Sequence, residues 1–367
     1  MIWVAWRQFR TQALITLGLL VAFAVLVLVT GLHLRDVYSS LGGIHCSPDE
    51  ACTAPHVPGL DKPLTSLLGP TLLAIPALLG MFWGAPLVPR ELESGTHRLA
   101  WTQSITRRRW LSIRVALVGV SALVVAGLAS WLVSWWFAPL DAVNLNRFDP
   151  SVFTERGTVA IGYAGFAFAL GVATGTLTRR TLPAMAATLL GFIAARIAFT
   201  LLVRPHLLAS RHVLYALTRG QDVGFVGNPT STTIVAGPPM IPNAWALSAV
   251  LVDRAHHSLN PAQLHDLLAR VCPAIATGLP ANPGAGATKT QAGSLAGGDF
   301  LTCLHALSRH LQLLVAYQPS SRYWPLQALE TAIFLAAALA LIGATVWGAG
   351  RRIARKPAAA PRAAHPA

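Results

Sequence analysis

Charged side chains are scarce in this chain of 367 residues: only 11% are Asp, Glu, Lys or Arg, whereas 54% are hydrophobic. Acids are the scarcer sign, with 14 against 28 basic residues. An ordinary soluble domain carries about 25% charged residues, so this composition excludes that class. In a soluble protein the net charge of +14 would suggest a nucleic-acid partner. Because the basic residues here lie beside long apolar segments, membrane topology and anionic headgroups explain them better, and we expect no nucleic-acid partner.

Motifs for catalysis, nucleotide binding and metal binding are also missing. The sequence contains no Gly-x-x-x-x-Gly-Lys-Ser/Thr phosphate loop, no nucleophile elbow and no His-Glu-x-x-His. Twelve histidines are present, but their spacing matches no standard zinc pattern. We therefore predict neither enzyme chemistry nor a metal site in this chain.

Long apolar segments dominate instead. There are six of them, at residues 13–34, 64–88, 111–137, 157–177, 183–203 and 325–348. At about 1.5 Å rise per residue, each can cross a hydrocarbon layer of about 30 Å as a helix. The first reads as a retained anchor, because it exceeds a normal signal-peptide core and no small-residue cleavage site follows it. We expect an all-α membrane protein with six transmembrane helices.

The charges sort between the two sides that these spans define. With the N-terminus inside, the inner segments hold 14 Lys or Arg and two acids, whereas the outer segments hold 12 against 11. This asymmetry follows the positive-inside rule, so both termini are predicted to be cytoplasmic. The inner segments are 1–12, 89–110, 178–182 and 349–367, and the outer ones are 35–63, 138–156 and 204–324.

All four cysteines, Cys46, Cys52, Cys272 and Cys303, fall on the predicted outer side. An oxidising exterior favours disulfides there, and four cysteines allow three pairings. The compact option joins Cys46 to Cys52 and Cys272 to Cys303, since each pair shares one loop. The sequence alone does not choose among the pairings, or between them and unpaired thiols.

The predicted organisation follows from these segments. Residues 1–12 combine Trp and Arg as an interfacial elbow helix or a plain anchor. Residues 13–203 should form helices one to five, with an inner loop at 89–110. Residues 204–324 should form an extracellular domain, 325–348 helix six, and 349–367 a basic disordered cytoplasmic tail.

Local patterns add detail within these ranges. Pro70, Pro76 and Pro86 predict a kinked or broken second span. Ala167, Gly171 and Gly175 form a small face in the fourth span, which favours helix packing over a substrate groove.

Two helices are expected in the extracellular domain. Asn260-Pro261 should open the first. Asp299 should cap the second, with apolar residues at helical spacing: Phe300, Leu304, Leu307, Leu311 and Leu314.

Two charged groups are candidate functional residues. Glu91 and Glu93 are the only acids on the predicted inner side, which fits a helix that docks onto a partner protein, with a solvated topological loop as the equal alternative. Arg196 and Glu330 lie within spans at similar predicted depth, roughly 10 Å and 8 Å from the outer end at helical rise. They form a candidate ion pair, with separate snorkelling to the interface and substrate contact as alternatives.

The inner loop, Arg90-Glu91-x-Glu93-x-Gly95-Thr96 followed by Leu99 and a basic cluster, resembles the cytoplasmic loop of ABC-2 type transporter permeases. Residues 317–330 are similar to the segment that introduces the last helix in permeases of this family from high-GC actinobacteria. The start, with Trp3, Trp6 and Arg7, is similar too.

The resemblance implies a type V exporter-like fold with an extracellular insertion between helices five and six. It implies an exporter subunit in the plasma membrane, and the largely apolar spans favour a hydrophobic or amphiphilic substrate over a highly charged one. The expected partners are an ABC ATPase subunit, a second copy of this chain and membrane lipids, with ATP and Mg²⁺ bound by the ATPase. The implied ATPase-coupling residues are Arg90, Glu91, Glu93, Gly95, Thr96, Arg98, Arg107 and Arg108. The alternative is a sensor or assembly factor that displays residues 204–324.

Overall fold

The structure, a computed structural model, forms two compact units. It describes residues 2–40, 71–93, 107–143, 148, 153–154, 156–217, 223–226, 233–237, 241, 244–273 and 297–352. The membrane unit comprises Met1–Asn144, Asp149–Leu207 and Trp324–Ala367, and the second unit comprises Leu145–Phe148 and Leu208–Tyr323. The sequence predicts the corresponding extracellular domain at 204–324.

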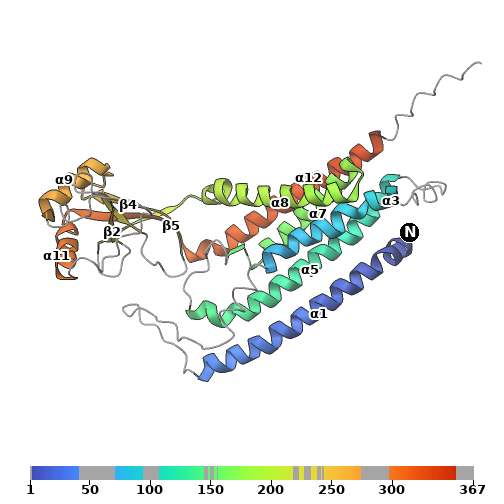
Figure 1. Cartoon of the computed structure of the whole chain (residues 1–367), viewed down its shortest axis with the longest axis horizontal. Coiled ribbons are helices and arrows are strands. Elements are labelled where there is room, and N and C mark those ends of the chain that lie inside the picture. Colours follow the sequence, from blue (N-terminus) through green and yellow to red (C-terminus); the bar gives the residue numbers. More distant parts are fainter. Residues whose placement is uncertain are drawn as a thin grey trace, which may run out of the picture. The chain divides into compact units, whose positions relative to one another are not determined.

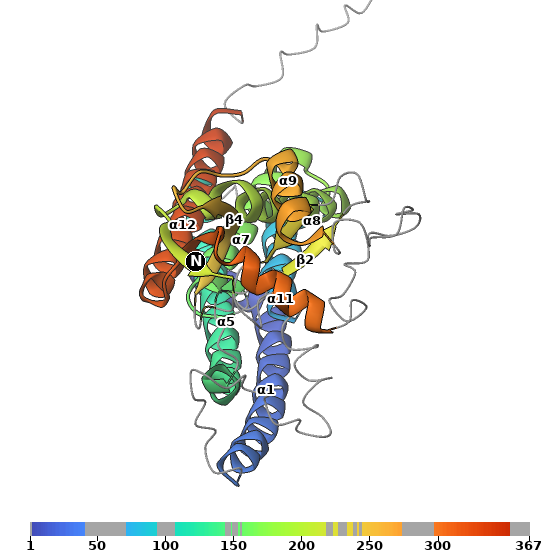
Figure 2. The same cartoon turned by 90° about the vertical axis from the view of Figure 1, so that its left-hand side faces the viewer.

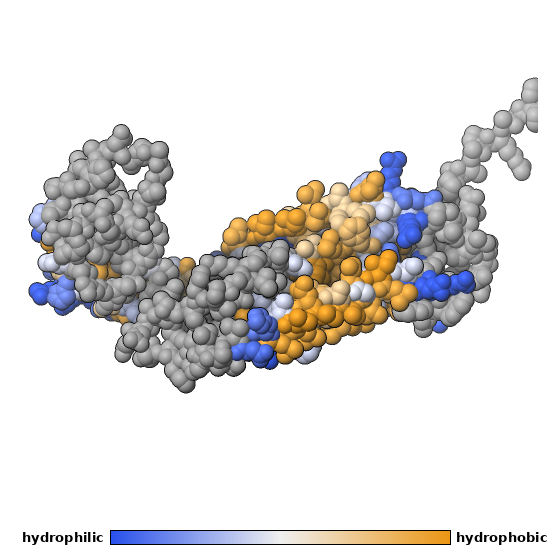
Figure 3. Space-filling view, turned by 60° about the horizontal axis from the view of Figure 1, so that its bottom comes forward, coloured by the Kyte–Doolittle hydropathy of each residue, from blue (hydrophilic) through white to orange (hydrophobic). Residues whose placement is uncertain are grey.

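Five helices of the membrane unit are long and apolar enough to cross a membrane. They are α1 (Ile2–Ser40), α5 (Arg107–Val143), α7 (Val159–Thr178), α8 (Thr181–Ala198, extended to His206 by the short helices η3 and η4) and α12 (Tyr323–Arg352) (Figure 1). Figure 3 shows a band of hydrophobic side chains over this unit with hydrophilic ones at both ends of the band. Such a band is the surface that a helix bundle presents to lipid.

The predicted second span, 64–88, is described from residue 71 onward and is a shorter apolar helix, Thr71–Leu87. Its helical geometry changes twice: a π-helix, η1 (Gly80–Gly84), is followed by a 3₁₀ turn, η2 (Ala85–Leu87), that contains Pro86. Proline cannot donate the backbone hydrogen bond of a regular helix, so the irregularity follows from the sequence. The helix α3 (Pro89–Glu93) comes directly after it.

Helix α7 is the most enclosed of the five, because 67% of the residues in its apolar stretch are buried. Its small face packs on the irregular helix so closely that side chains would not fit. A Cβ built on Gly84 would lie 2.5 Å from the Phe168 carbonyl oxygen, and one built on Gly171 would meet the Gly80 carbonyl oxygen. The small face expected from Ala167, Gly171 and Gly175 is therefore a helix-packing face.

Helix α1 lies beside α5 (Figures 1 and 2), and the two share a buried cluster around Val27, Leu34, Val133 and Trp136. Residues 2–12 continue into the first span without a break. The elbow expected for residues 1–12 is thus not a separate helix. The described sequence there contains no proline or glycine that would interrupt it.

The second unit contains strands, which the all-α expectation missed. In a three-stranded antiparallel sheet, β5 (Leu311–Gln318) lies between β1 (Arg211–Ala216) and β4 (Trp245–Asp253). A hairpin joins β2 (Val223–Val226) to β3 (Thr233–Ala236). The all-α prediction holds for the membrane unit and is wrong for the second unit, which is α+β.

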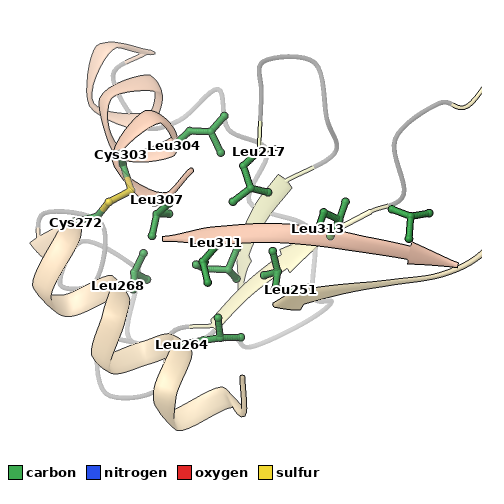
Figure 4. Close-up of a cluster of buried hydrophobic side chains, with 12 residues drawn as sticks. Leu217, Leu251, Leu264, Leu268, Cys272, Cys303, Leu304, Leu307, Leu311 and Leu313 are labelled. Atoms are coloured by element: carbon green, nitrogen blue, oxygen red, sulfur yellow. A yellow bond between two sulfur atoms is a disulfide. The ribbon is translucent and has the colours of Figure 1, made fainter. Parts of the chain in front are cut away.

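Two helices cover this sheet, α9 (Pro261–Val271) and α11 (Gly297–Leu307). Asn260 caps α9 as expected, in a reciprocal capping box with Gln263. The Cys272–Cys303 disulfide joins the two helices, with 5.5 Å between the Cα atoms, beside a core that includes Leu268, Leu307 and Leu313 (Figure 4). Cys46 and Cys52 lie outside the described residues.

The second helix expected in this region ends earlier than its apolar spacing suggested. Helix α11 stops at Leu307, and Leu311 and Leu314 belong to β5. Residues 311–316 form a short apolar run, which hydrophobic periodicity alone does not distinguish from a buried helix segment. In the structure Leu311, Leu313 and Val315 are buried at alternate positions, which is the period of a strand.

Candidate functional site

A buried ion pair lies between the end of the α8 segment and the beginning of α12. Arg204, in η4 (Arg204–His206), is 3% exposed and Glu330 is 0% exposed. The pair is bidentate: the guanidinium Nε donates to Oε2 of the carboxylate at 3.0 Å, and Nη2 donates to Oε1 at 2.8 Å. This fork geometry is the strongest form of an ion pair between side chains, and burial keeps water from competing with it.

Tyr163 of α7 completes the arrangement. Its hydroxyl donates to Oε1 of Glu330 and accepts from Nη2 of Arg204 at 3.1 Å. Arg196 of α8 lies over the Tyr163 ring, with its guanidinium carbon 3.6 Å from the ring centroid. We call these four residues, Tyr163, Arg196, Arg204 and Glu330, the polar cluster. It joins α7 and the α8 segment, which are neighbours in the chain, to α12, more than a hundred residues further on.

Aromatic rings enclose the polar cluster. The Phe153 ring lies 4.9 Å from the guanidinium carbon of Arg204. Phe334, one turn after Glu330, makes edge contact with Tyr163 at 4.9 Å between centroids and also contacts Phe199 at 4.8 Å. These rings exclude water from the ion pair and favour cations over their faces.

Gln327 fixes the segment that leads into α7. Its side-chain oxygen accepts from the Val159 N–H at 3.1 Å, and its nitrogen donates to the carbonyls of Phe153 and Arg156 at 2.8 and 3.1 Å. Gly157 has a positive φ of 79° and lies against this amide, so a side chain there would be strained. Gln327 is 0% exposed, and it holds Phe153 where that ring meets Arg204.

The sequence offered Arg196 as a candidate ion-pair partner of Glu330, but the partner in the structure is a different arginine. Arg204 takes that place, and Arg196 stacks on Tyr163 instead. The fifth span predicted from the sequence ends at residue 203, which places Arg204 in the following loop. In the structure a π-helix, η3 (Phe199–Val203), and η4 carry the helix on to His206. Tyr163 and Gln327 were not singled out, and a polar residue inside an apolar span is the signal that points to both.

The predicted coupling loop is described only at its two ends. Arg90 and Glu93 are exposed on α3, Glu91 lies in α3, and Arg107 and Arg108 begin α5. Gly95, Thr96 and Arg98 lie outside the described residues. The sequence-based assignment of these residues to a partner stays a prediction.

Glu93 has a partner within the chain. Its Oε1 accepts the backbone N–H of Thr181 at 2.9 Å, and its Oε2 accepts the Thr181 hydroxyl at 2.8 Å. Thr181 is the first residue of α8, so the carboxylate binds at the positive end of a helix. The backbone hydrogen bond from Thr181, followed by the side-chain one, lowers the pKa of Glu93 below its ordinary value. Glu93 therefore ties α3 to the tight turn between α7 and α8.

Comparison with known proteins gives one match. The family described as ABC-2 membrane transporter related matches residues 17–204, more than half of the chain. The matched range runs from α1 to Arg204 and so contains Glu93, Tyr163 and Arg196. No curated protein and no solved structure matches the chain.

Proposed function

The chain belongs to the ABC-2 membrane transporter related family, and we propose that it is the transmembrane permease subunit of an ABC exporter. It moves a hydrophobic or amphiphilic substrate across the plasma membrane, with ATP hydrolysed by a separate subunit. The observation that carries the proposal is the family match over residues 17–204, within a multi-pass unit of five apolar helices. Permeases of this family work with an ATPase subunit in general and are not themselves catalytic.

Coupling to the ATPase is proposed to run through the loop between α3 and α5. Arg90, Glu91 and Glu93 stand at its start, Arg107 and Arg108 at its end, and Gly95, Thr96 and Arg98 lie between them. The two hydrogen bonds that Thr181 donates to the Glu93 carboxylate support this role. A push on α3 reaches the first turn of α8 directly, because both ends of that contact are on helices.

The working assembly is proposed to contain two copies of this chain and two ATPase subunits in a lipid bilayer, with ATP and Mg²⁺ in the ATPase. Both termini then face the cytoplasm, which the excess of basic residues in the inner segments supports. The second unit follows His206 and precedes α12, so it lies on the outer side in this arrangement.

The first experiment is a mild-detergent pull-down of the intact chain from its native membrane, with mass spectrometry of the bound proteins. We expect an ATP-binding subunit at near one-to-one stoichiometry. Its reproducible absence, with the chain intact and folded, would rule out the transporter assignment.

A pair of variants tests the coupling loop. Glu91→Ala should reduce ATPase association or stimulation while membrane insertion stays normal. Glu93→Ala should do the same and also loosen the first turn of α8, because that residue binds Thr181. Asp253→Ala, which removes a carboxylate at the end of β4 in the second unit, is the control and should leave association unchanged. Normal coupling in both loop variants would remove this loop from the mechanism.

A second candidate function is a non-transport membrane protein, a sensor or an assembly factor that displays residues 204–324. The observation in its favour is that the second unit has its own sheet, hydrophobic core and disulfide. Pull-down of a different partner through this unit, with no ATPase bound, would favour it.

A further inference from the structure

Arg196 carries a charge that the polar cluster does not balance. Arg204 and Glu330 neutralise each other, and both carboxylate oxygens of Glu330 are taken up by Arg204 and Tyr163. The guanidinium of Arg196 lies over the face of the Tyr163 ring, and its N–H groups donate no hydrogen bond within the part of the chain that the structure describes. The cluster therefore has a net charge of +1.

The position of Arg196 makes that charge accessible from the lipid side. The residue is partly exposed and lies on α8 between Ile193 and Ile197, which are 44% and 55% exposed. Leu190, two turns before Ile197, is 68% exposed. The partly exposed Arg196 thus borders an apolar helix face that acyl chains can cover.

A cation in an apolar membrane segment is costly unless an anion or a polar cavity accompanies it. A guanidinium presents several N–H groups in one plane, which suits the paired oxygens of a phosphate or carboxylate. The Tyr163 ring fixes the guanidinium plane from one side and leaves its donors unused. Arg196 is thus oriented before any ligand arrives.

We propose that Arg196, held over the Tyr163 ring, binds the acidic headgroup of a membrane amphiphile whose acyl chains lie along Leu190, Ile193 and Ile197. The ligand class is an amphiphile with a phosphate or carboxylate group. The site stands on this geometry and goes beyond the proposed function, since it exists whether or not the chain transports. If the chain does transport, the site selects anionic over zwitterionic cargo.

The test measures binding of fluorescent phosphatidylglycerol and phosphatidylcholine to the purified full chain in neutral detergent, without any ATPase. The wild-type chain should bind phosphatidylglycerol more tightly than phosphatidylcholine. Arg196→Gln should weaken the binding of phosphatidylglycerol by about tenfold and leave the binding of phosphatidylcholine unchanged. Arg196→Lys should lose less, because it keeps the charge without the fork. Arg180→Gln, which removes an exposed cation at the N-cap of the same helix, is the control and should bind as the wild type does.

A second variant keeps the test decisive if Arg196→Gln does not fold. Ile193→Glu places a carboxylate one turn before Arg196, where it neutralises the guanidinium, and should abolish the lipid preference. Equal affinity of the wild-type chain for both lipids, or unchanged preference in folded Arg196→Gln and Ile193→Glu, would overturn the proposal. If inorganic phosphate displaces the fluorescent phosphatidylglycerol as effectively as unlabelled phosphatidylglycerol does, the proposal of an amphiphile ligand would be overturned. Arg196 would then be a simple anion site. Because no ATPase takes part, failure here leaves the transporter proposal standing, and a failed pull-down leaves this one standing.

Discussion

At the scale of single residues, the two arginines of the polar cluster have different roles, although both lie in the same extended helix. Arg204 is fully paired with Glu330 and shares Tyr163 with it, so removing any one of the three leaves a buried polar group without its partner. Arg196 lies over the Tyr163 ring and donates no side-chain hydrogen bond among the residues that the structure describes. Stability should therefore depend on Arg204, and ligand contact on Arg196.

The first prediction concerns the ion pair. Arg204→Met should destabilise the chain by about 3–5 kcal/mol, because it leaves the Glu330 charge buried and unpaired. The double variant Arg204→Met/Glu330→Gln should recover much of that loss, since it removes the charge and keeps an acceptor for the Tyr163 hydroxyl. Thermal unfolding of the purified chain in detergent measures both. Arg196→Met is the comparison and should cost less, and a double variant no more stable than Arg204→Met would contradict the pairing.

At the scale of elements, close helix packing and one capping carboxylate position the spans. The irregular helix Thr71–Leu87 crosses α7 where both contribute glycines, and Glu93 binds the first turn of α8 just beyond that crossing. The loop to which we assign ATPase coupling thus follows a helix, α3, that is tied to α8.

The second prediction tests the crossing. Gly84→Ala should destabilise the membrane unit by about 1–3 kcal/mol, because the new Cβ would lie 2.5 Å from the backbone oxygen of Phe168. Gly343→Ala on α12 has nothing within 4 Å and should be neutral or slightly stabilising, since alanine is the better helix former. Thermal unfolding of the two variants compares them directly. Equal stability of the two would show that the helices separate without cost.

The third prediction tests the Glu93 contact. Glu93→Ala should speed amide hydrogen exchange at the start of α8, and Glu93→Gln, which keeps one acceptor, should have a smaller effect. Because folding lowers the pKa of Glu93, this contact should be fully present above the ordinary Glu value of 4.5 and be lost as pH falls through the lowered pKa. Exchange followed by mass spectrometry between neutral and acid pH measures it. Arg90→Ala is the control and should leave exchange at the start of α8 unchanged. If Arg90→Ala speeds this exchange as much as Glu93→Ala does, the result would count against the contact.

At the scale of the whole molecule, the chain combines a helical membrane unit with a second unit that has its own core and a covalent link. The membrane unit is held by helix packing and the polar cluster, whereas the second unit is held by a sheet, two helices and Cys272–Cys303. The two should therefore respond differently to reducing conditions.

The fourth prediction concerns this disulfide. Cys272→Ser/Cys303→Ser should destabilise the second unit by about 3–4 kcal/mol, the loop-closure contribution for a sequence separation of 31. Limited proteolysis of the intact chain should then cut the second unit faster and leave the membrane helices protected. A reductant should have the same effect on the wild-type chain and none on the variant. If the protease cuts the membrane helices as fast as the second unit in this variant, the two units would unfold together.

The sequence by itself determined the membrane class, the approximate ranges of the five long spans, the helix cap at Asn260 and the family resemblance that the match over residues 17–204 confirms. These depend on length, hydropathy and local capping, which neighbouring residues fix. The tertiary structure decided that Arg204 rather than Arg196 binds Glu330, that Glu93 contacts Thr181 and that Leu311–Gln318 is a central strand. Each of these joins segments far apart in the chain, so only the packing of the helices and strands against one another selects among partners that the local sequence leaves equivalent.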